Sequence, residues 1–160
     1  MEEWKEYKLG DLFSHFRSGK GINADEISST GEYPVYGGNG LRGFTYHKNF
    51  EGDCAIIGRQ GAFCGNVRYF KGRAYMTEHA IVAVANMHNN TRFLAYLLSL
   101  MKLGRFSGQS AQPGLSVTEL AKQCIAVPPL STQVCIANLL SSLDDKIELN
   151  RRINDNLNLN

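Results

Sequence analysis

Short apolar segments separated by turn residues fill the first half of the chain. The segments are four to six residues long, and Gly, Asn or Asp bounds each one, a pattern typical of strands in a sandwich-like or barrel-like β-rich body. The last of these segments, Ala80–Ala85, is apolar on both faces, so we expect it near the centre of a sheet. The predicted strands are Tyr33–Tyr36, Gly43–Tyr46, Cys54–Ile57, Asn66–Phe70 and Ala80–Ala85.

Helical spacing replaces this pattern in the second half. Residues 91–103 predict a helix that Thr91 caps and Gly104 stops, with apolar side chains around most of its circumference. Ser116–Glu119 is a capping box, in which the serine oxygen accepts from the glutamate amide and the glutamate reaches back, so a short helix begins there. Cys124–Val127 then returns as a strand that two prolines end. The sequence therefore predicts an α+β fold, a β-rich domain with a few short helices.

A different pattern follows the prolines, where residues 131–160 predict one long helix capped by Ser131 or Thr132. Its seam positions alternate spacings of four and three, as in the a/d seam of a coiled coil. Such a stripe needs a second helix to cover it, unless the helix folds back on its own domain. We therefore divide the chain into a domain of residues 1–130 and a dimerisation or spacer helix of residues 131–160. The seam residues are Ile136, Leu140, Leu143, Ile147, Asn150, Asn154 and Leu157.

Charge is distributed unevenly along the chain, whose net charge is +2. Residues 54–118 contain seven basic side chains against one acidic side chain, Glu78. Residues 131–160 contain three basic against four acidic side chains. A basic middle with a neutral tail favours a polyanion-binding domain joined to a separate packing element, although a basic solvated surface is the alternative.

Cysteine usage and hydropathy narrow the class of protein further. Cys54, Cys64, Cys124 and Cys135 are scattered, without a C-x-x-C pair or clustered histidines, which argues against a zinc site and a disulfide scaffold. No apolar run is long enough to span a bilayer, and the polar start of the chain is unlike a signal or transit peptide. We expect a cytoplasmic protein with free thiols and no membrane association.

The candidate catalytic motifs lack the neighbouring secondary structure that their chemistry needs. Residues 38–43 match G-x-G-x-x-G, but the aromatic residues that follow predict a strand, so a glycine-rich hairpin is favoured over a dinucleotide site. Glu78 and His79 are adjacent on a predicted strand, where neighbouring side chains point to opposite faces. No nucleophile elbow and no phosphate-binding P-loop is found. We therefore expect no active site and no cofactor.

Polar and basic residues on glycine-rich loops remain as candidates for DNA contact. Arginine can bridge guanine O6 and N7, and glutamine can bridge adenine N6 and N7, so Arg59 and Gln60 are suited to base edges. Lys71 and Arg73 are better suited to phosphates, and residues 17–20 are expected to form an exposed basic turn. The predicted DNA-binding set is Arg17, Lys20, Asn39, Arg42, Arg59, Gln60, Arg68, Lys71, Arg73, Arg105, Gln109 and Gln112.

Several segments, in order, resemble the target recognition domain of type I restriction-modification specificity subunits. The resemblance covers nearly the whole chain and rests on the combination, because no single segment suffices. The segments are Trp4 with Leu9–Leu12, Tyr33–Gly40, Ile56–Gly61 with Cys64–Gly65, Thr77–Val82, Gln112–Leu115, and Val127–Leu130 with the helix that begins near Gln133.

The resemblance implies sequence-specific recognition of double-stranded DNA within a complex. Methyltransferase subunits would carry S-adenosylmethionine, and a restriction and translocase subunit would use ATP. This sequence has no methyltransferase, nuclease or ATPase motif of its own. Glycines shared by members that read different DNA, such as Gly37, Gly38 and Gly40, are expected to build turns rather than choose bases.

Members of this family carry two recognition domains and two such helices, whereas this sequence has one of each. We expect either a fragment of a longer chain or a half-subunit that pairs with a second half or with its own copy through the helix. Two alternatives stay open. One is the recognition domain of a fused type II restriction-methyltransferase, and the other is a protein-interaction module that binds no DNA.

Overall fold

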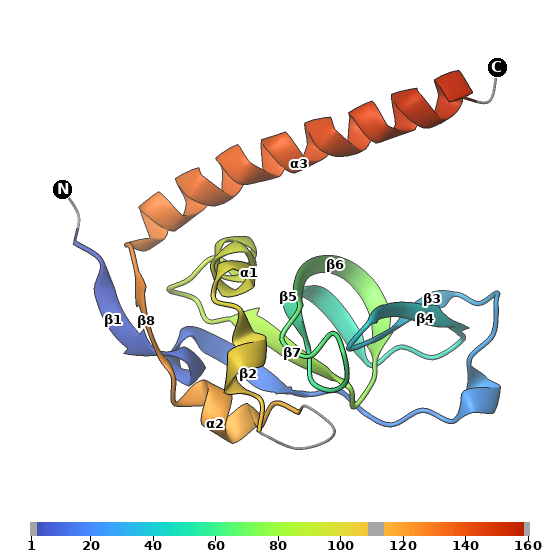
Figure 1. Cartoon of the computed structure of the whole chain (residues 1–160), viewed down its shortest axis with the longest axis horizontal. Coiled ribbons are helices and arrows are strands. Elements are labelled where there is room, and N and C mark those ends of the chain that lie inside the picture. Colours follow the sequence, from blue (N-terminus) through green and yellow to red (C-terminus); the bar gives the residue numbers. More distant parts are fainter. Residues whose placement is uncertain (1–2, 109–113, 159–160) are drawn as a thin grey trace.

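The computed structural model describes residues 3–108 and 114–158, and it has the α+β architecture that the sequence predicts. Strands form the body, short helices cover it, and one long helix follows (Figure 1). In chain order the elements are β1 (Lys5–Lys8), the 3-10 helix η1 (Leu9–Leu12), β2 (Phe13–Ser18), η2 (Ala24–Glu26), β3 (Tyr33–Gly37), β4 (Gly40–Thr45), β5 (Phe50–Gly58), β6 (Val67–Met76), β7 (Ala80–Ala85), α1 (Thr91–Leu100), η3 (Leu103–Phe106), α2 (Val117–Ala121), β8 (Cys124–Val127) and α3 (Leu130–Asn158).

Six strands form one sheet in the order β2-β7-β5-β6-β3-β4, in which β3 and β6 are parallel and the other neighbours antiparallel. β7 pairs with β2 on one side and β5 on the other, so the apolar segment Ala80–Ala85 is an interior strand, as its pattern predicts. β1 and β8 form a separate two-stranded sheet. The sequence pattern did not indicate β1 or β2.

The sheet buries apolar side chains on both faces. Ile57 and Ile81 pack with Leu94 and Leu98 of α1 in the larger cluster. The smaller cluster lies on the other face, and Tyr36 of β3 reaches it with its ring 5.1 Å from that of Phe70. β6 curves strongly (Figure 1), and Gly52 and Gly72 face each other with φ of 133° and 143° where β5 and β6 bend. This bend carries the β3–β4 hairpin over the second face.

The helix ends differ in part from the sequence prediction. The side chain of Asn90, not Thr91, caps α1 by accepting from the amide of Phe93, while the Thr91 hydroxyl accepts from the amide of Ala85. Asparagine is the stronger capping residue, and Thr91 is drawn into the first turn. α1 ends at Leu100, three residues before the predicted end.

α2 keeps only half of the predicted capping box. The Ser116 hydroxyl accepts from the amide of Glu119, as predicted. The Glu119 carboxylate, however, accepts from Lys122 one turn later in the chain. An ammonium is the stronger donor for a carboxylate, so the glutamate does not reach back.

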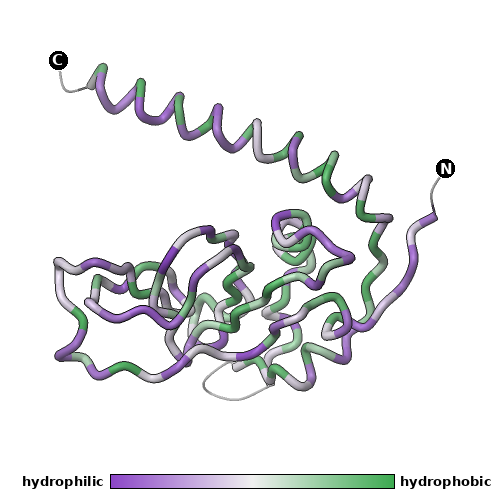
Figure 2. The backbone as a smooth tube through the Cα atoms, turned by 180° about the vertical axis from the view of Figure 1, so that it is seen from behind, coloured by the Kyte–Doolittle hydropathy of each residue, from purple (hydrophilic) through white to green (hydrophobic). Residues whose placement is uncertain are grey.

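Helix α3 contacts the domain along its N-terminal half. Gln133, in the first turn of the helix, is buried, with 1% of its surface exposed. Further along, Asp144 accepts a hydrogen bond from the Tyr96 hydroxyl of α1. Beyond that contact the helix continues away from α1, and apolar and polar residues alternate along its length (Figures 1 and 2). Ile136 packs against the core of its own domain, whereas Leu143, Ile147 and Leu157 are exposed, and their cover by a second helix stays a prediction. Among residues 3–108 and 114–158, no helix is long and apolar enough to cross a membrane.

Candidate nucleic-acid interface

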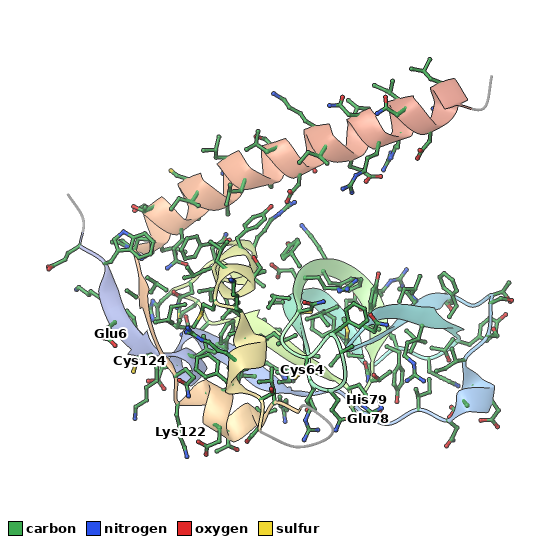
Figure 3. All side chains as sticks on the ribbon, viewed as in Figure 1. Glu6, Cys64, Glu78, His79, Lys122 and Cys124 are labelled. Atoms are coloured by element: carbon green, nitrogen blue, oxygen red, sulfur yellow. The ribbon has the colours of Figure 1, made fainter. Side chains whose placement is uncertain are left out.

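Three loops that are distant in the sequence meet around a shallow polar hollow of about 430 Å³. The β3–β4 hairpin contributes Asn39 and Arg42, the loop after β5 contributes Gln60, and the β6–β7 turn contributes His79. Figure 3 places Glu78 and His79 on the side of the body that faces away from α3. The hollow therefore unites three of the residues predicted to contact DNA.

Glycine makes this convergence possible because the hairpin backbone lies directly on its neighbours. A Cβ atom on Gly38 would stand 2.7 Å from the carbonyl oxygen of His79, closer than real Cβ contacts. Gly37 leaves room for the aliphatic part of Arg42, whose Cδ would stand 2.9 Å from an added Cβ. Gly37 pairs with Gly40, so residues 38–43 form the predicted hairpin and not a dinucleotide-binding turn.

Glu78, His79 and Gln60 form a polar row, of which His79 and Gln60 line the hollow. His79 Nδ1 lies 2.8 Å from Gln60 Oε1, and His79 Nε2 lies 3.2 Å from Glu78 Oε1. The prediction that Glu78 and His79 diverge on a strand was wrong, because both lie in the turn before β7. A turn frees neighbouring side chains from the alternation that a strand imposes.

A second polar hollow, of about 470 Å³, is lined by Arg68, Lys102 and Arg105 together with the amide of Asn66. The guanidinium of Arg68 also packs over Gly40, where an added Cβ would stand 2.8 Å from a guanidinium nitrogen. Arg68 thus lies between this hollow and the β3–β4 hairpin. Lys102 was not among the predicted residues; it takes a left-handed conformation with φ of 52° after α1. These three cations suit phosphate oxygens.

Arg59 has a structural contact as well as a place near the hollow. Its Nε donates to the carbonyl oxygen of Leu115 at 3.4 Å, and its own carbonyl oxygen accepts from the Leu115 amide at 2.8 Å. The side chain is partly buried. Arg59 therefore ties the loop after β5 to the segment before α2.

Arg17 and Lys20 line a third hollow, of about 270 Å³, with His15 and Asn49. Arg17 is in strand β2 and not in the predicted turn, because residues Phe13–Ser18 pair with β7. Its Nε donates to His15 Nδ1 at 3.3 Å, and burial followed by the charge of Arg17 lowers the pKa of His15.

Lys71 and Arg73 do not join these hollows. In the β5–β6 register Lys71 faces Asp53 and Arg73 faces Glu51, so an acid lies opposite each cation. Arg73 also lies over the ring of Tyr33, with its Cζ 5.6 Å from the ring centroid. The remaining predicted positions, Gln109 and Gln112, lie outside the described residues.

The arrangement offers hydrogen bonding and positive charge rather than bond-making chemistry. Amide, guanidinium and imidazole groups surround the first hollow, which supplies both donors and acceptors. Burial raises the pKa of the Cys54 thiol to about 12, so this cysteine is a core residue and not a nucleophile. Within the described part of the chain, no group of three or more His, Cys, Asp or Glu residues could hold a metal ion.

Residues 1–159 match the family model of the type I restriction modification DNA specificity domain. The chain belongs to this family. It is 39% identical over 146 residues to the type I restriction enzyme EcoprrI specificity subunit of Escherichia coli, covering 89% of this chain and 36% of that protein. It is 30% identical over 145 residues to a putative type I specificity subunit of Mycoplasma pneumoniae, covering 87% of this chain and 39% of that protein.

Solved structures share the fold of this specificity domain. The S subunit of a type I restriction-modification system from M. genitalium superposes with a TM-score of 0.82 at 19% identity, covering 92% of this chain and 40% of that chain. The HsdS subunit from Thermoanaerobacter tengcongensis superposes with a TM-score of 0.66 at 13% identity, covering 93% of this chain and 39% of that chain. This specificity domain therefore spans about two fifths of the length of the relatives it matches.

Proposed function

We propose that the chain reads one part of a bipartite DNA target as the specificity module of a type I restriction-modification complex and carries no active site of its own. The observation that carries the proposal is the hollow at which Asn39, Arg42, Gln60 and His79 meet, with Arg68 beside it. Such side chains can hydrogen-bond base edges in the major groove. The relatives named as specificity subunits support the same role.

The cations that line the second hollow supply the affinity that base contacts need. Arg68, Lys102 and Arg105 line one hollow, and within the described residues none of them forms an ion pair with an acid or lies opposite one in a strand register. Phosphate contacts orient a protein on a duplex and release counterions, so binding weakens as salt rises. Base reading at the first hollow and phosphate binding at the second together fit a duplex ligand.

The exposed part of α3 is the proposed partner surface. Leu143 and Ile147 are about half exposed, at and just beyond the point where Asp144 makes the contact of the helix with Tyr96 of α1. A second half-subunit, or a second copy of this chain, would cover that seam. Methyltransferase subunits with S-adenosylmethionine and, through them, an ATP-dependent restriction and translocase subunit are the proposed catalytic partners. The chain itself is proposed to need no cofactor.

Duplex binding measured by fluorescence anisotropy over a range of salt concentrations tests this function, with the chain alone and with its methyltransferase partner. We expect sequence-dependent binding whose log–log salt slope is negative. Arg42→Ala should relax the preference at one base pair, whereas Arg151→Ala on the exposed part of α3 should leave it unchanged. Equal binding to every duplex, alone and with the partner, would show that the proposal is wrong.

A further inference from the structure

The row of Glu78, His79 and Gln60 has a polarity that depends on where the imidazole hydrogens lie. Glu78 Oε1 is 3.2 Å from His79 Nε2, and Glu78 Oε2 is buried without a hydrogen-bond partner in the described part of the chain. An ionised carboxylate only accepts hydrogen bonds. His79 Nε2 must therefore carry a hydrogen whenever the pair is formed.

This requirement leaves His79 Nδ1 with one of two roles. A neutral imidazole has a single N–H, so Nδ1 is then an acceptor, whereas in the imidazolium both nitrogens donate. The third possibility, a hydrogen on Nδ1 alone, would direct the Nε2 lone pair at the Glu78 carboxylate and is disfavoured. The charge of His79 thus decides whether Nδ1 needs a donor or an acceptor from the Gln60 amide, which lies 2.8 Å away.

Gln60 can satisfy either role by turning its amide through 180°. Beside a neutral His79, the amide NH2 must face Nδ1, and the oxygen then points into the hollow as an acceptor. Beside an imidazolium, the oxygen accepts from Nδ1 and the NH2 group points into the hollow as a donor. The same glutamine therefore offers opposite hydrogen-bonding groups to a ligand.

We propose that Glu78 and His79 are positioning residues that fix which half of the Gln60 amide faces the hollow, and thereby which base edge Gln60 reads. The inference rests on the proposed function. As an acceptor, Gln60 selects the amino group of adenine or cytosine; as a donor, it selects purine N7, guanine O6 or thymine O4. The charged residues near His79 are Glu78 from its own turn, Arg42 of β4, which lines the same hollow, and Arg59, whose backbone nitrogen donates to the His79 carbonyl oxygen.

The first experiment needs no DNA. The ring 15N chemical shifts of His79 in the 15N-histidine-labelled full chain report its tautomer. We expect the hydrogen on Nε2 in the neutral form, and a mixture of both tautomers in Glu78→Ala. Glu119→Ala is the matched control, because its carboxylate accepts from Lys122 and makes no contact with His79. A wild-type hydrogen on Nδ1, or a Glu78→Ala spectrum identical to wild type, overturns the inference.

The second experiment selects duplexes from a pool with randomised positions, at about pH 8 and about pH 5.5, with the full chain and its methyltransferase partner. In the wild type we expect the preference at one base pair to change with pH. His79→Phe and Gln60→Ala should both reduce a preference of roughly tenfold or more at that base pair to less than about threefold. His47→Phe, at an exposed loop position, should change neither the base preference nor its dependence on pH. Thermal unfolding midpoints should confirm that all variants fold.

The outcomes separate this inference from the proposed function. If Gln60→Ala erases a preference that His79→Phe retains at both pH values, the DNA-reading function stands and the positioning role is wrong. If the wild type binds every duplex equally, the proposed function is wrong and the base-reading role fails with it. The tautomer measurement then still decides whether Glu78 and His79 orient the Gln60 amide.

Discussion

Gln133 Oε1 on helix α3 accepts a hydrogen bond of 2.9 Å from the backbone nitrogen of Asn90, whose own side chain caps helix α1. The Gln133 amide nitrogen donates to Asn89 Oδ1 and to the carbonyl oxygen of Pro128, each at 2.9 Å. One buried glutamine therefore joins the starts of two helices and the end of β8. It sets the direction in which α3 leaves the domain.

Gln133→Ala should lower the free energy of unfolding by about 2–4 kcal/mol. The substitution removes three hydrogen bonds and leaves the half-buried Asn90 amide and the buried Pro128 carbonyl without the glutamine partner. Urea denaturation measures the change. Gln123→Ala is the control, since that side chain donates a hydrogen bond to the Glu119 carbonyl oxygen on the surface, and its loss should cost less than about 1 kcal/mol. Equal costs for the two variants would contradict the joining role of Gln133.

Leu143→Asp with Ile147→Asp should abolish association through α3 while leaving the domain folded. The two side chains are 48% and 50% exposed, so the folded chain loses little packing, whereas a covering helix would have to bury two carboxylates. Analytical ultracentrifugation, with and without partner subunits, measures the association.

Leu149→Asp is the matched control for the seam. Leu149 is 57% exposed on the same helix, but its position is not one of the seam positions. Association should survive this substitution. A sedimentation profile that responds equally to Leu149→Asp and to the seam pair, or to neither, would count against the seam as the partner surface.

Gly38→Ala should destabilise the domain by about 1–3 kcal/mol and weaken sequence-dependent DNA binding. The added Cβ meets backbone on two sides, the His79 carbonyl oxygen at 2.7 Å and the Arg59 nitrogen at 3.4 Å, so the hairpin must move away from the hollow. Gly108→Ala is the control, because nothing lies within 4 Å of its Cβ position. Thermal unfolding of both variants tests the difference, and a Gly38→Ala protein as stable as Gly108→Ala would refute the close approach.

Strands with an apolar pattern of their own could be predicted from the sequence. Strands that form only because a distant segment pairs with them could not. Ala80–Ala85 is apolar throughout, so its interior place followed from the sequence. Lys5–Lys8 is exposed at every position and is a strand only because Lys5 pairs with Val127, far along the chain. Local pattern carries no information about such a pairing.

The sequence predicted which residue types make up the candidate site, but it did not predict that they lie together. Asn39, Arg42 and Gln60 were each suited to base edges, but their meeting depends on the close approach of Gly38 to the β6–β7 turn. His79 was assigned to the strand that follows it, which hid its contact with Gln60, 19 residues away. A histidine directly before an apolar strand was the signal that could have suggested a turn.

Stability should fall on acidification in a way that depends on His15. Burial, and then the charge of Arg17, hold the pKa of His15 below its ordinary value of 6.5, so the unfolded chain binds the proton more readily. The contribution of His15 to the free energy of unfolding is fully present above pH 6.5 and is lost as pH falls through that value. The loss stops below the lowered pKa of the folded state. Urea denaturation between about pH 5 and pH 8 should show His15→Asn losing part of this slope, by less than about 1 kcal/mol because solvent screens the site. Identical pH curves for both proteins would exclude His15 as a source.

Lys102 and Arg105 should contribute more to DNA affinity than Lys71 and Arg73. The first pair lines a polar hollow with Arg68, whereas Asp53 and Glu51 lie opposite the second pair. An acid beside a cation offsets its attraction for phosphate and reduces the number of counterions that binding releases. Each of Lys102→Ala and Arg105→Ala should therefore reduce the magnitude of the log–log salt slope by about 1, with base preference unchanged.

The double variant Lys71→Ala with Arg73→Ala is the matched comparison, since it also removes two positive charges from the chain. Because net charge changes equally, long-range attraction to DNA falls equally in this variant and in the double variant Lys102→Ala with Arg105→Ala, and the difference between them isolates direct phosphate contact. We expect the Lys71 and Arg73 pair to leave the salt slope nearly unchanged. A larger loss of slope for this pair than for Lys102 and Arg105 would move the phosphate-binding surface to the β5–β6 bend, away from the hollow that contains Gln60.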